Sequence, residues 1–176
     1  MKLKDLMVVN EIFNSTVNIK WFEDGSKLEG HFSVDDQAYV IQLEFAIYNF
    51  DGVDYQLLNV AFYRDGSGLE GDDSDPYGLT NDTKNPAKVL GAIINGVAEK
   101  TKKIHVDALI FAAANNVEKR MKFYNKVAAR FVKGFSTMIR DVSGATGKFT
   151  ILLSDSIPRQ LRKRVVDFVA EKNQDK

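Results

Sequence analysis

The fold is decided by the stretch Val106-Asp107-Ala108-Leu109-Ile110-Phe111-Ala112-Ala113-Ala114, an apolar run of strand length between two helical patterns. Before this run, apolar residues recur at helical spacing from Pro86 onward. After it, they recur at Val117, Met121, Tyr124 and Phe131. A strand that is apolar throughout is covered on both faces. We therefore expect this strand at the centre of a mixed sheet, with helices over residues 86–103 and 116–133 packed against it.

The N-terminal third of the chain predicts an antiparallel β-meander. Runs rich in β-branched and aromatic residues are separated by the turn signals Asp24-Gly25, Asp35-Asp36 and Asp51-Gly52. The runs cover residues 17–22, 28–34, 38–48 and 55–63. Residues 65–85 differ because they are acidic, rich in glycine and poor in apolar anchors, which predicts a long loop. A last strand over 149–153 and a helix opened by Ser156 and Pro158 complete the pattern.

These elements predict one α+β domain over residues 1–176. Its sheet is expected to be mixed and mainly antiparallel, with the meander followed by the order α-β-α-β-α. The chain has 176 residues, 44% of them hydrophobic, which suffices for one core without disulfides. It has no cysteine, which excludes thiolate catalysis, and its two histidines lack metal-ligand spacing, so no metal is expected.

The sequence shows no spanning apolar run and no signal-peptide pattern. We therefore expect a cytoplasmic protein without membrane contact, and a place in a virion stays open.

Charge is distributed unevenly along the chain. Residues 1–100 carry 8 Lys and Arg against 17 Asp and Glu, and the remaining residues carry 16 against 7. One interpretation is a mixed surface in which interleaved elements bring both signs together. The other is a basic face that binds an anionic ligand such as a nucleotide cofactor or nucleic acid. That face would be formed by Lys119, Lys122, Lys126, Arg130, Arg162, Lys163 and Arg164.

Candidate functional residues follow the apolar strand, and each also has a structural interpretation. Asn115 and Asn116 fit helix caps as well as ligand contacts. Tyr124 fits a general acid or a packed tyrosine whose hydroxyl is satisfied. Arg120 fits an anion-binding group or one partner of an ion pair. Glu44, on the longest expected strand, acts as a base through water if it faces a cleft, and otherwise faces solvent.

Several short motifs between residues 78 and 131 carry a resemblance. They are Thr80 in a turn, a Val-rich helix over 89–93, a strand ending in Phe111-Ala112-Ala113, and a helix with Arg120 and Tyr124. They resemble uncharacterised tailed-bacteriophage proteins. The order of meander, loop, helix, strand and Tyr-bearing helix resembles the GNAT acyltransferases.

The resemblance implies acetyl-CoA or another acyl-CoA between splayed strands, with the pyrophosphate at the loop before the first helix. The implied cofactor-binding residues are Thr80, Asn81, Lys84, Lys88, Asn115 and Asn116. Tyr124 would protonate the leaving thiolate. The segment from Gly78 to Lys88 has no second glycine, so Lys84 and Lys88 would supply positive charge in place of a glycine-lined cradle.

Three functions remain open from the sequence. The first is an acyl-CoA-dependent N-acyltransferase of phage type, or a descendant that has lost catalysis. The second is a non-enzymatic phage protein that binds a host or virion protein. The third is nucleic-acid binding by the basic C-terminal half, which lacks interleaved exposed aromatic residues. A splay between the strands around 55–63 and 106–114 would favour the first.

Overall fold

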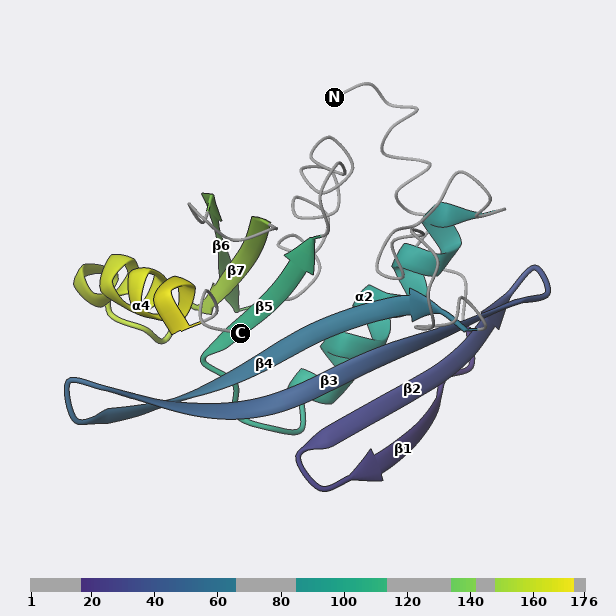
Figure 1. Ribbon diagram of the computed structural model, residues 1–176, viewed down its shortest axis with the longest axis horizontal. Coiled ribbons are helices and arrows are strands. Elements are labelled where there is room, and N and C mark those ends of the chain that lie inside the picture. Colours follow the sequence, from purple (N-terminus) through teal and green to yellow (C-terminus); the bar gives the residue numbers. More distant parts are fainter. Residues whose placement is uncertain (1–16, 66–84, 114–133, 142–147, 173–176) are drawn as a thin grey trace.

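The computed structural model describes residues 17–65, 85–113, 134–141 and 148–172. Seven strands form one sheet in the order β1-β2-β3-β4-β5-β7-β6, and two described helices pack on it (Figure 1). The strands are β1 (Lys20–Asp24), β2 (Lys27–Val34), β3 (Gln37–Phe50), β4 (Val53–Arg64), β5 (Ala108–Ala113), β6 (Phe135–Asp141) and β7 (Lys148–Ser154). The helices are α2 (Pro86–Thr101) and α4 (Arg159–Lys172).

Two-residue turns set the register of the meander β1 to β4. Asp35 and Asp36 join β2 to β3, and Asp51 and Gly52 join β3 to β4, all with positive φ. Two successive positive φ values define the type I′ turn, whose twist matches that of an antiparallel hairpin. The result is a long β3–β4 hairpin that projects beyond the neighbouring strands (Figure 1).

The other half of the sheet attaches through β5. This strand pairs in parallel with β4 and antiparallel with β7, and β7 pairs antiparallel with the edge strand β6. The β4–β5 ladder is the parallel one among the described strand pairs. The sheet is therefore mixed and mostly antiparallel.

Each face of the sheet has its own apolar core. Helix α2 covers one face, where it packs on β2, β3, β4 and β5 through a stripe that includes Val89, Ile93 and Val97. Helix α4 packs through Val165 and Val169 on the other face, over Leu57 of β4 and over β5 and β7. Neither described helix is long and apolar enough to cross a membrane.

The chain segment before β1 is held against α2 by two glycines. Trp21 and Ile19 pack against the first core, and a Cβ atom added to Gly30 would lie 2.8 Å from both side chains. A Cβ atom on Gly96 of α2 would lie 2.8 Å from Ile19 Cδ1. The Lys100 ammonium lies 4.7 Å from the centre of the Trp21 ring, a cation–π distance. Ile19 therefore lies between β2 and the helix.

The coarse fold prediction is confirmed, with two corrections. Leu109 and Phe111 are buried at the centre of the sheet, at 0% and 8% exposure. The strand begins at Ala108 and not at Val106, because Asp107 directs its N–H to Gln56 of β4 and its C=O to Ser154 of β7, whereas both groups of a residue in a regular strand face the same side. The predicted order α-β-α-β-α omitted β6. The predicted helix over 116–133, and all of the predicted loop except Asp65 and Asn85, lie outside the described residues.

Candidate functional site

The sheet divides between β4 and β5. Their ladder runs from Leu57 opposite Ala108 to Val60 opposite Phe111 and goes no further. Beyond that point β4 stays paired with β3 as far as Arg64, and β5 stays paired with β7 as far as Ala113. The carboxyl ends of β4 and β5 consequently point apart (Figure 1). Strands β4 and β5 therefore separate beyond Val60 and Phe111.

The backbone of Phe62 faces this divergence. The hydrogen bond from Asp65 N to Ala38 O, 2.9 Å long, shows that odd-numbered residues of β4 direct their amides toward β3. Because amide directions alternate along a strand, Phe62 directs its N–H and C=O toward the side of β5. The β4–β5 ladder has already ended at Val60. Among the described strands, none pairs with these two groups of Phe62.

Asp107 closes the opposite end of the β4–β5 junction. Its N–H donates to Gln56 O at 2.8 Å, and its Oδ2 accepts from Gln56 N at 2.8 Å. Its own carbonyl accepts from Ser154 N at 2.7 Å, and His105 Nε2 lies 3.0 Å from its Oδ1. Asp107 is 8% exposed, and its carboxylate joins β5 to β4. His105 lies on the solvent side of this carboxylate. Among the described residues, β4 and β5 are therefore joined at the Asp107 end and unpaired with each other beyond Val60 and Phe111.

Lys88 stands in the first turn of α2. Asn85 caps this helix by accepting a hydrogen bond from Lys88 N at 3.2 Å, and Pro86 follows the cap, as the sequence predicts. The Lys88 ammonium lies 3.9 Å from Asp35 Oδ1, with more than a third of each side chain exposed. Such an exposed pair contributes little, so Lys88 remains available to an anion.

Glu44 lies on the face of the sheet opposite α2. It is paired with Asn59 of β4 and Lys27 of β2, and it is half-buried. Asn59 precedes Val60, where the β4–β5 ladder ends. Two strand spacings, about 10 Å, separate Glu44 from β5. Its role as a base stays a prediction.

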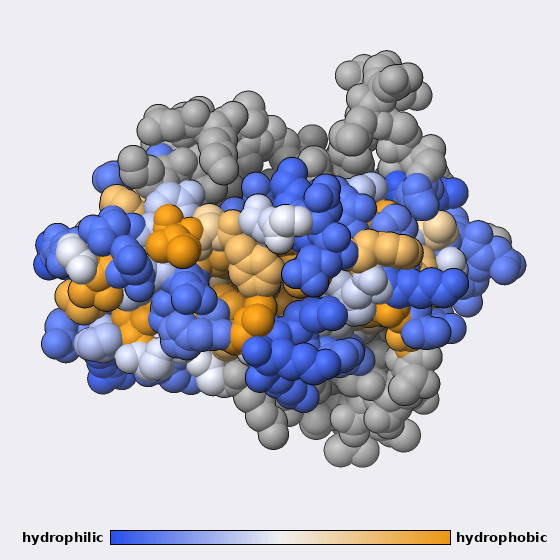
Figure 2. All heavy atoms as spheres, turned by 90° about the horizontal axis from the view of Figure 1, so that it is seen from below, coloured by the Kyte–Doolittle hydropathy of each residue, from blue (hydrophilic) through white to orange (hydrophobic). Residues whose placement is uncertain are grey.

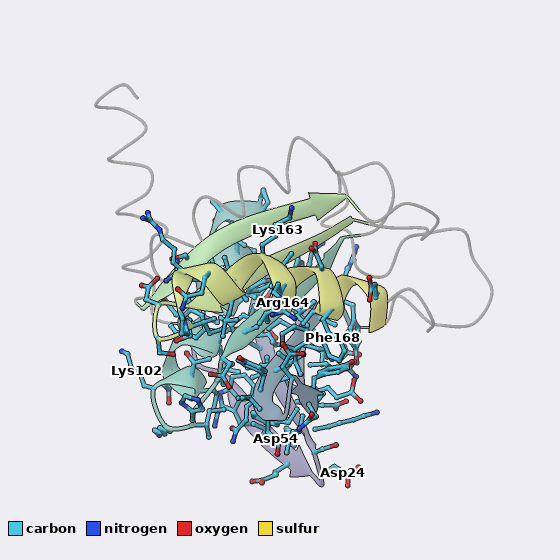
Figure 3. All side chains as sticks on the ribbon, turned by 90° about the vertical axis from the view of Figure 1, so that its left-hand side faces the viewer. Asp24, Asp54, Lys102, Lys163, Arg164 and Phe168 are labelled. Atoms are coloured by element: carbon cyan, nitrogen blue, oxygen red, sulfur yellow. The ribbon has the colours of Figure 1, made fainter. Side chains whose placement is uncertain are left out.

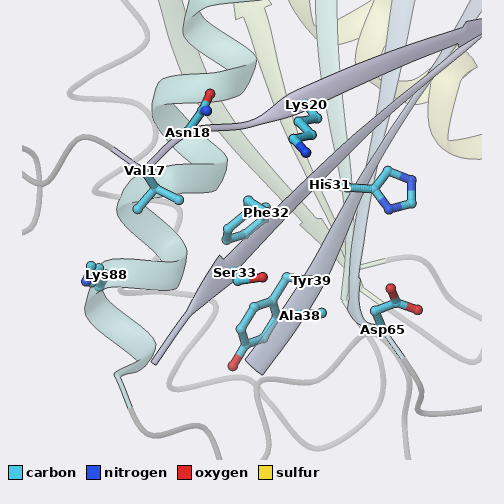
Figure 4. A pocket seen from close by; sticks show the side chains of 10 residues that line it. All are labelled: Val17, Asn18, Lys20, His31, Phe32, Ser33, Ala38, Tyr39, Asp65 and Lys88. Atoms are coloured by element: carbon cyan, nitrogen blue, oxygen red, sulfur yellow. The ribbon is translucent and has the colours of Figure 1, made fainter. Parts of the chain in front are cut away.

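A hollow of about 460 Å³ lies at the end of β2 (Figure 4). We call it the β2-edge hollow. The β1–β2 ladder ends at Lys20 opposite His31, whereas β2 runs on to Val34 alongside β3. The hollow occupies the space between this bare end of β2 and the departing segment before β1. It is lined by Val17, Asn18, Lys20, His31, Phe32, Ser33, Ala38, Tyr39, Asp65 and Lys88.

Two arginines of the predicted basic face make internal contacts. Arg164 Nη2 lies 2.8 Å from Asp51 Oδ2, and its guanidinium lies 5.1 Å from the Phe50 ring centre. Arg162 donates to Ile157 O and Ser136 Oγ at 3.1 and 2.9 Å. Lys163 points from the opposite side of α4 to Arg164 (Figure 3). The described part of this face therefore offers fewer free cations than the sequence suggested.

The surface of the described residues is mixed in polarity. Seen from below, apolar side chains lie among hydrophilic ones (Figure 2). Large apolar side chains stand out at Phe22, Ile47, Val53 and Ile104, with exposures from 36% to 69%. Within the described ranges, no group of three or more His, Asp or Glu side chains is arranged to hold a metal ion.

Most of the residues that the sequence singled out lie outside the described residues: Thr80, Asn81, Lys84, Asn115, Asn116, Arg120 and Tyr124. Their roles stay predictions. Sequence reasoning missed Asp107 and the β2-edge hollow. Asp107 carried one usable signal, a carboxylate at the start of an otherwise apolar run.

A scan against protein-family models and searches of curated proteins and of solved structures found no match to this chain. The argument for function therefore rests on the geometry and on the motifs in the sequence.

Proposed function

We propose that the protein binds acyl-CoA where β4 and β5 diverge and transfers the acyl group to an amine. The observation that carries this proposal is the early end of the β4–β5 ladder at Val60 and Phe111. It leaves the Phe62 backbone directed toward the gap. The pantetheine arm of CoA carries amides that suit such an edge. Ligands in open α/β sheets also collect beyond the carboxyl ends of the strands.

The start of α2 supplies the second half of the proposed site. A helix N-terminus favours negative charge because its first N–H groups have no partner within the helix. Lys88 adds a cation in that first turn. We propose that Lys84 and Lys88 bind the pyrophosphate, with Thr80, Asn81, Asn115 and Asn116 as further contacts to the cofactor.

The bound acyl-CoA supplies a thioester whose carbonyl carbon is open to attack by an amine. Under this proposal Glu44 removes a proton from the amine through a water molecule, and Tyr124 donates a proton to the departing sulfur. Arg120 holds an anionic group of the acceptor. The setting we propose, from the resemblance to phage proteins, is the cytoplasm of an infected cell.

The test is binding of acetyl-CoA and CoA to the full chain, measured by thermal melting and calorimetry. A ligand that binds only the native state stabilises it by about 2.7 kcal/mol at about 100 times Kd. Replacing Lys84 and Lys88 together with alanine should reduce the shift, whereas Lys163→Ala should not. Tyr124→Phe should keep binding and slow turnover. Absence of both heat and melting shift at millimolar CoA would rule the proposal out.

A second candidate is binding of a host or virion protein by the projecting β3–β4 hairpin. Ile47 and Val53 lie on this hairpin with 69% and 51% of their surface exposed. Under this candidate Ile47, the more exposed of the two, is the contact residue of the hairpin. Pull-down from host lysate with the wild-type chain and with Ile47→Lys tests it. Equal recovery of the same proteins by both chains would count against the hairpin.

A further inference from the structure

Strand β1 forms one edge of the sheet and pairs with β2 on its inner side. Phe45 N donates to Ser26 O at 3.0 Å, so even-numbered residues of β2 direct their amides toward β3 and odd-numbered ones toward β1. The β2 residues that face β1 are paired with the even-numbered residues of β1. Trp21 and Glu23 therefore direct their N–H and C=O groups outward, where no described strand pairs with them.

The side chains of β1 alternate between the two faces of the sheet. Trp21 packs toward α2, whereas Lys20, Phe22 and Asp24 lie on the opposite face. Phe22 is 58% exposed, and its ring meets the His31 ring edge to face with centres 5.2 Å apart. This face of β1 therefore carries an exposed aromatic ring between a cation and an anion.

The order Lys20, Phe22, Asp24 is complementary to a second copy of itself. Two copies of β1 can pair antiparallel through their outward main-chain groups, about a two-fold axis at Phe22. Lys20 of each copy then lies opposite Asp24 of the other, and the two Phe22 rings lie opposite each other. Trp21 of each copy exchanges two hydrogen bonds with Glu23 of the other. Opposite charges and paired aromatic rings both stabilise an antiparallel ladder.

The neighbouring registers lack this match. A two-fold axis at Glu23 would place the two Glu23 side chains directly opposite each other, which is destabilising. An axis at Trp21 would no longer pair Lys20 with Asp24. In the matched register Glu23 of the second copy also lies beside Trp21, whose ring centre is 4.7 Å from the Lys100 ammonium. Charge complementarity therefore selects one register.

We propose that β1 is a dimerisation edge, which pairs with β1 of a second copy of this chain and joins the two sheets into one. The strand has five residues, so the interface is small and the dimer forms reversibly as the concentration rises. Strands β2 and β3 separate β1 from the β4–β5 divergence. The proposal therefore does not depend on acyl-CoA binding.

The experiment is sedimentation equilibrium of the full chain between about 10 and about 500 µM, without ligand. The average mass should rise from that of a monomer toward that of a dimer, with a Kd on the order of 100 µM. Glu23→Pro should abolish the dimer, because it removes an outward N–H and leaves the β1–β2 ladder intact. Thermal melting checks that each variant is folded.

Charge reversal tests the register. Lys20→Glu and Asp24→Lys would each place like charges opposite each other in the dimer, so each variant alone should associate at least about tenfold more weakly than wild type. An equimolar mixture of the two variants restores opposite charges at both positions and should form a heterodimer with about wild-type affinity. Lys163→Glu and Glu171→Lys are the matched controls, because they reverse exposed charges on α4, away from β1 (Figure 1). The controls should associate like wild type.

Three results would overturn the proposal. One is a wild-type chain that stays monomeric over the whole concentration range. Another is wild-type association of Glu23→Pro and of both β1 charge variants, which would place the contact elsewhere on the molecule. The third is a mixture of Lys20→Glu and Asp24→Lys that associates no better than either variant alone.

Discussion

Asp107 and Gln56 exchange two hydrogen bonds, one through the backbone and one through a carboxylate. Asp107 N donates to Gln56 O, and Asp107 Oδ2 accepts from Gln56 N, both at 2.8 Å. A side chain thus completes the first step of the parallel ladder between β4 and β5. The strands are fastened at this end and separate at the other after Val60 and Phe111.

We predict that Asp107→Ala lowers the free energy of unfolding by about 1–3 kcal/mol, because the Gln56 N–H loses the carboxylate acceptor that the buried Asp107 supplies. Asp107→Asn should cost less because its amide oxygen still accepts. Denaturant unfolding measures both. His105→Ala is the control, since 65% of the His105 side chain is exposed. A loss for His105→Ala as large as that for Asp107→Ala would contradict this account.

Leu109→Asp should destabilise by more than about 4 kcal/mol, because an unpaired charge would lie in a fully buried strand. Ile47→Asp makes a comparable change at a strand position that is 69% exposed. It should cost no more than about 1 kcal/mol. Thermal melting of the two variants checks the difference. Similar melting temperatures would mean that β5 is not central to the core.

Gly30→Ala should cost about 1–3 kcal/mol, because the new methyl group would lie 2.8 Å from both Trp21 Cζ3 and Ile19 Cγ2. Gly96→Ala should cost less. There the closest atom is the flexible end of Ile19, and alanine favours the helix by about 1 kcal/mol. Emission from the single tryptophan should change more for Gly30→Ala. The reverse order of stability would mean that Trp21 is not wedged against β2.

Arg162→Ala should lower stability by about 1.5–3 kcal/mol. Its guanidinium donates to Ile157 O, Ser136 Oγ and Asp155 O, which ties the start of α4 to β6 and to the turn after β7. Arg162→Lys should restore only part of the loss, because an ammonium group lacks the planar fork. Lys163→Ala, on the exposed side of the same helix, should change stability by less than about 0.5 kcal/mol. Denaturant-induced unfolding of Arg162→Ala, Arg162→Lys and Lys163→Ala measures the three differences in stability.

Local chemistry explains which parts of the fold the sequence predicted. Some features depend only on a few adjacent residues and can be predicted from the sequence. They are the turns at Asp35-Asp36 and Asp51-Gly52 and the helix cap at Asn85. Strand β6 was not, because Phe135 to Asp141 forms an edge that pairs only with β7 among the described strands. Gly134 precedes this strand with a φ of 88°, a conformation that glycine adopts without strain.

The two candidate sites were harder to predict, because both depend on where neighbouring strands stop pairing. The β2-edge hollow exists because β1 leaves β2 at Lys20 while β2 continues. The divergence exists because β4 follows β3 while β5 follows β7. Neither event has a local sequence signature. The contact of Arg164 with Asp51 has no local signature either, because the two residues are distant in sequence.

The contact between the β3–β4 hairpin and α4 has a consequence for the order of folding. Tyr48 and Phe50 each form an aromatic pair with Phe168, and Asp51 pairs with Arg164. During synthesis the meander emerges from the ribosome long before α4. The rings of Tyr48 and Phe50, in the outer half of the β3–β4 hairpin, therefore lack their Phe168 contact until α4 has been synthesised. We expect a nascent chain in this state to be more open to aggregation than the completed fold.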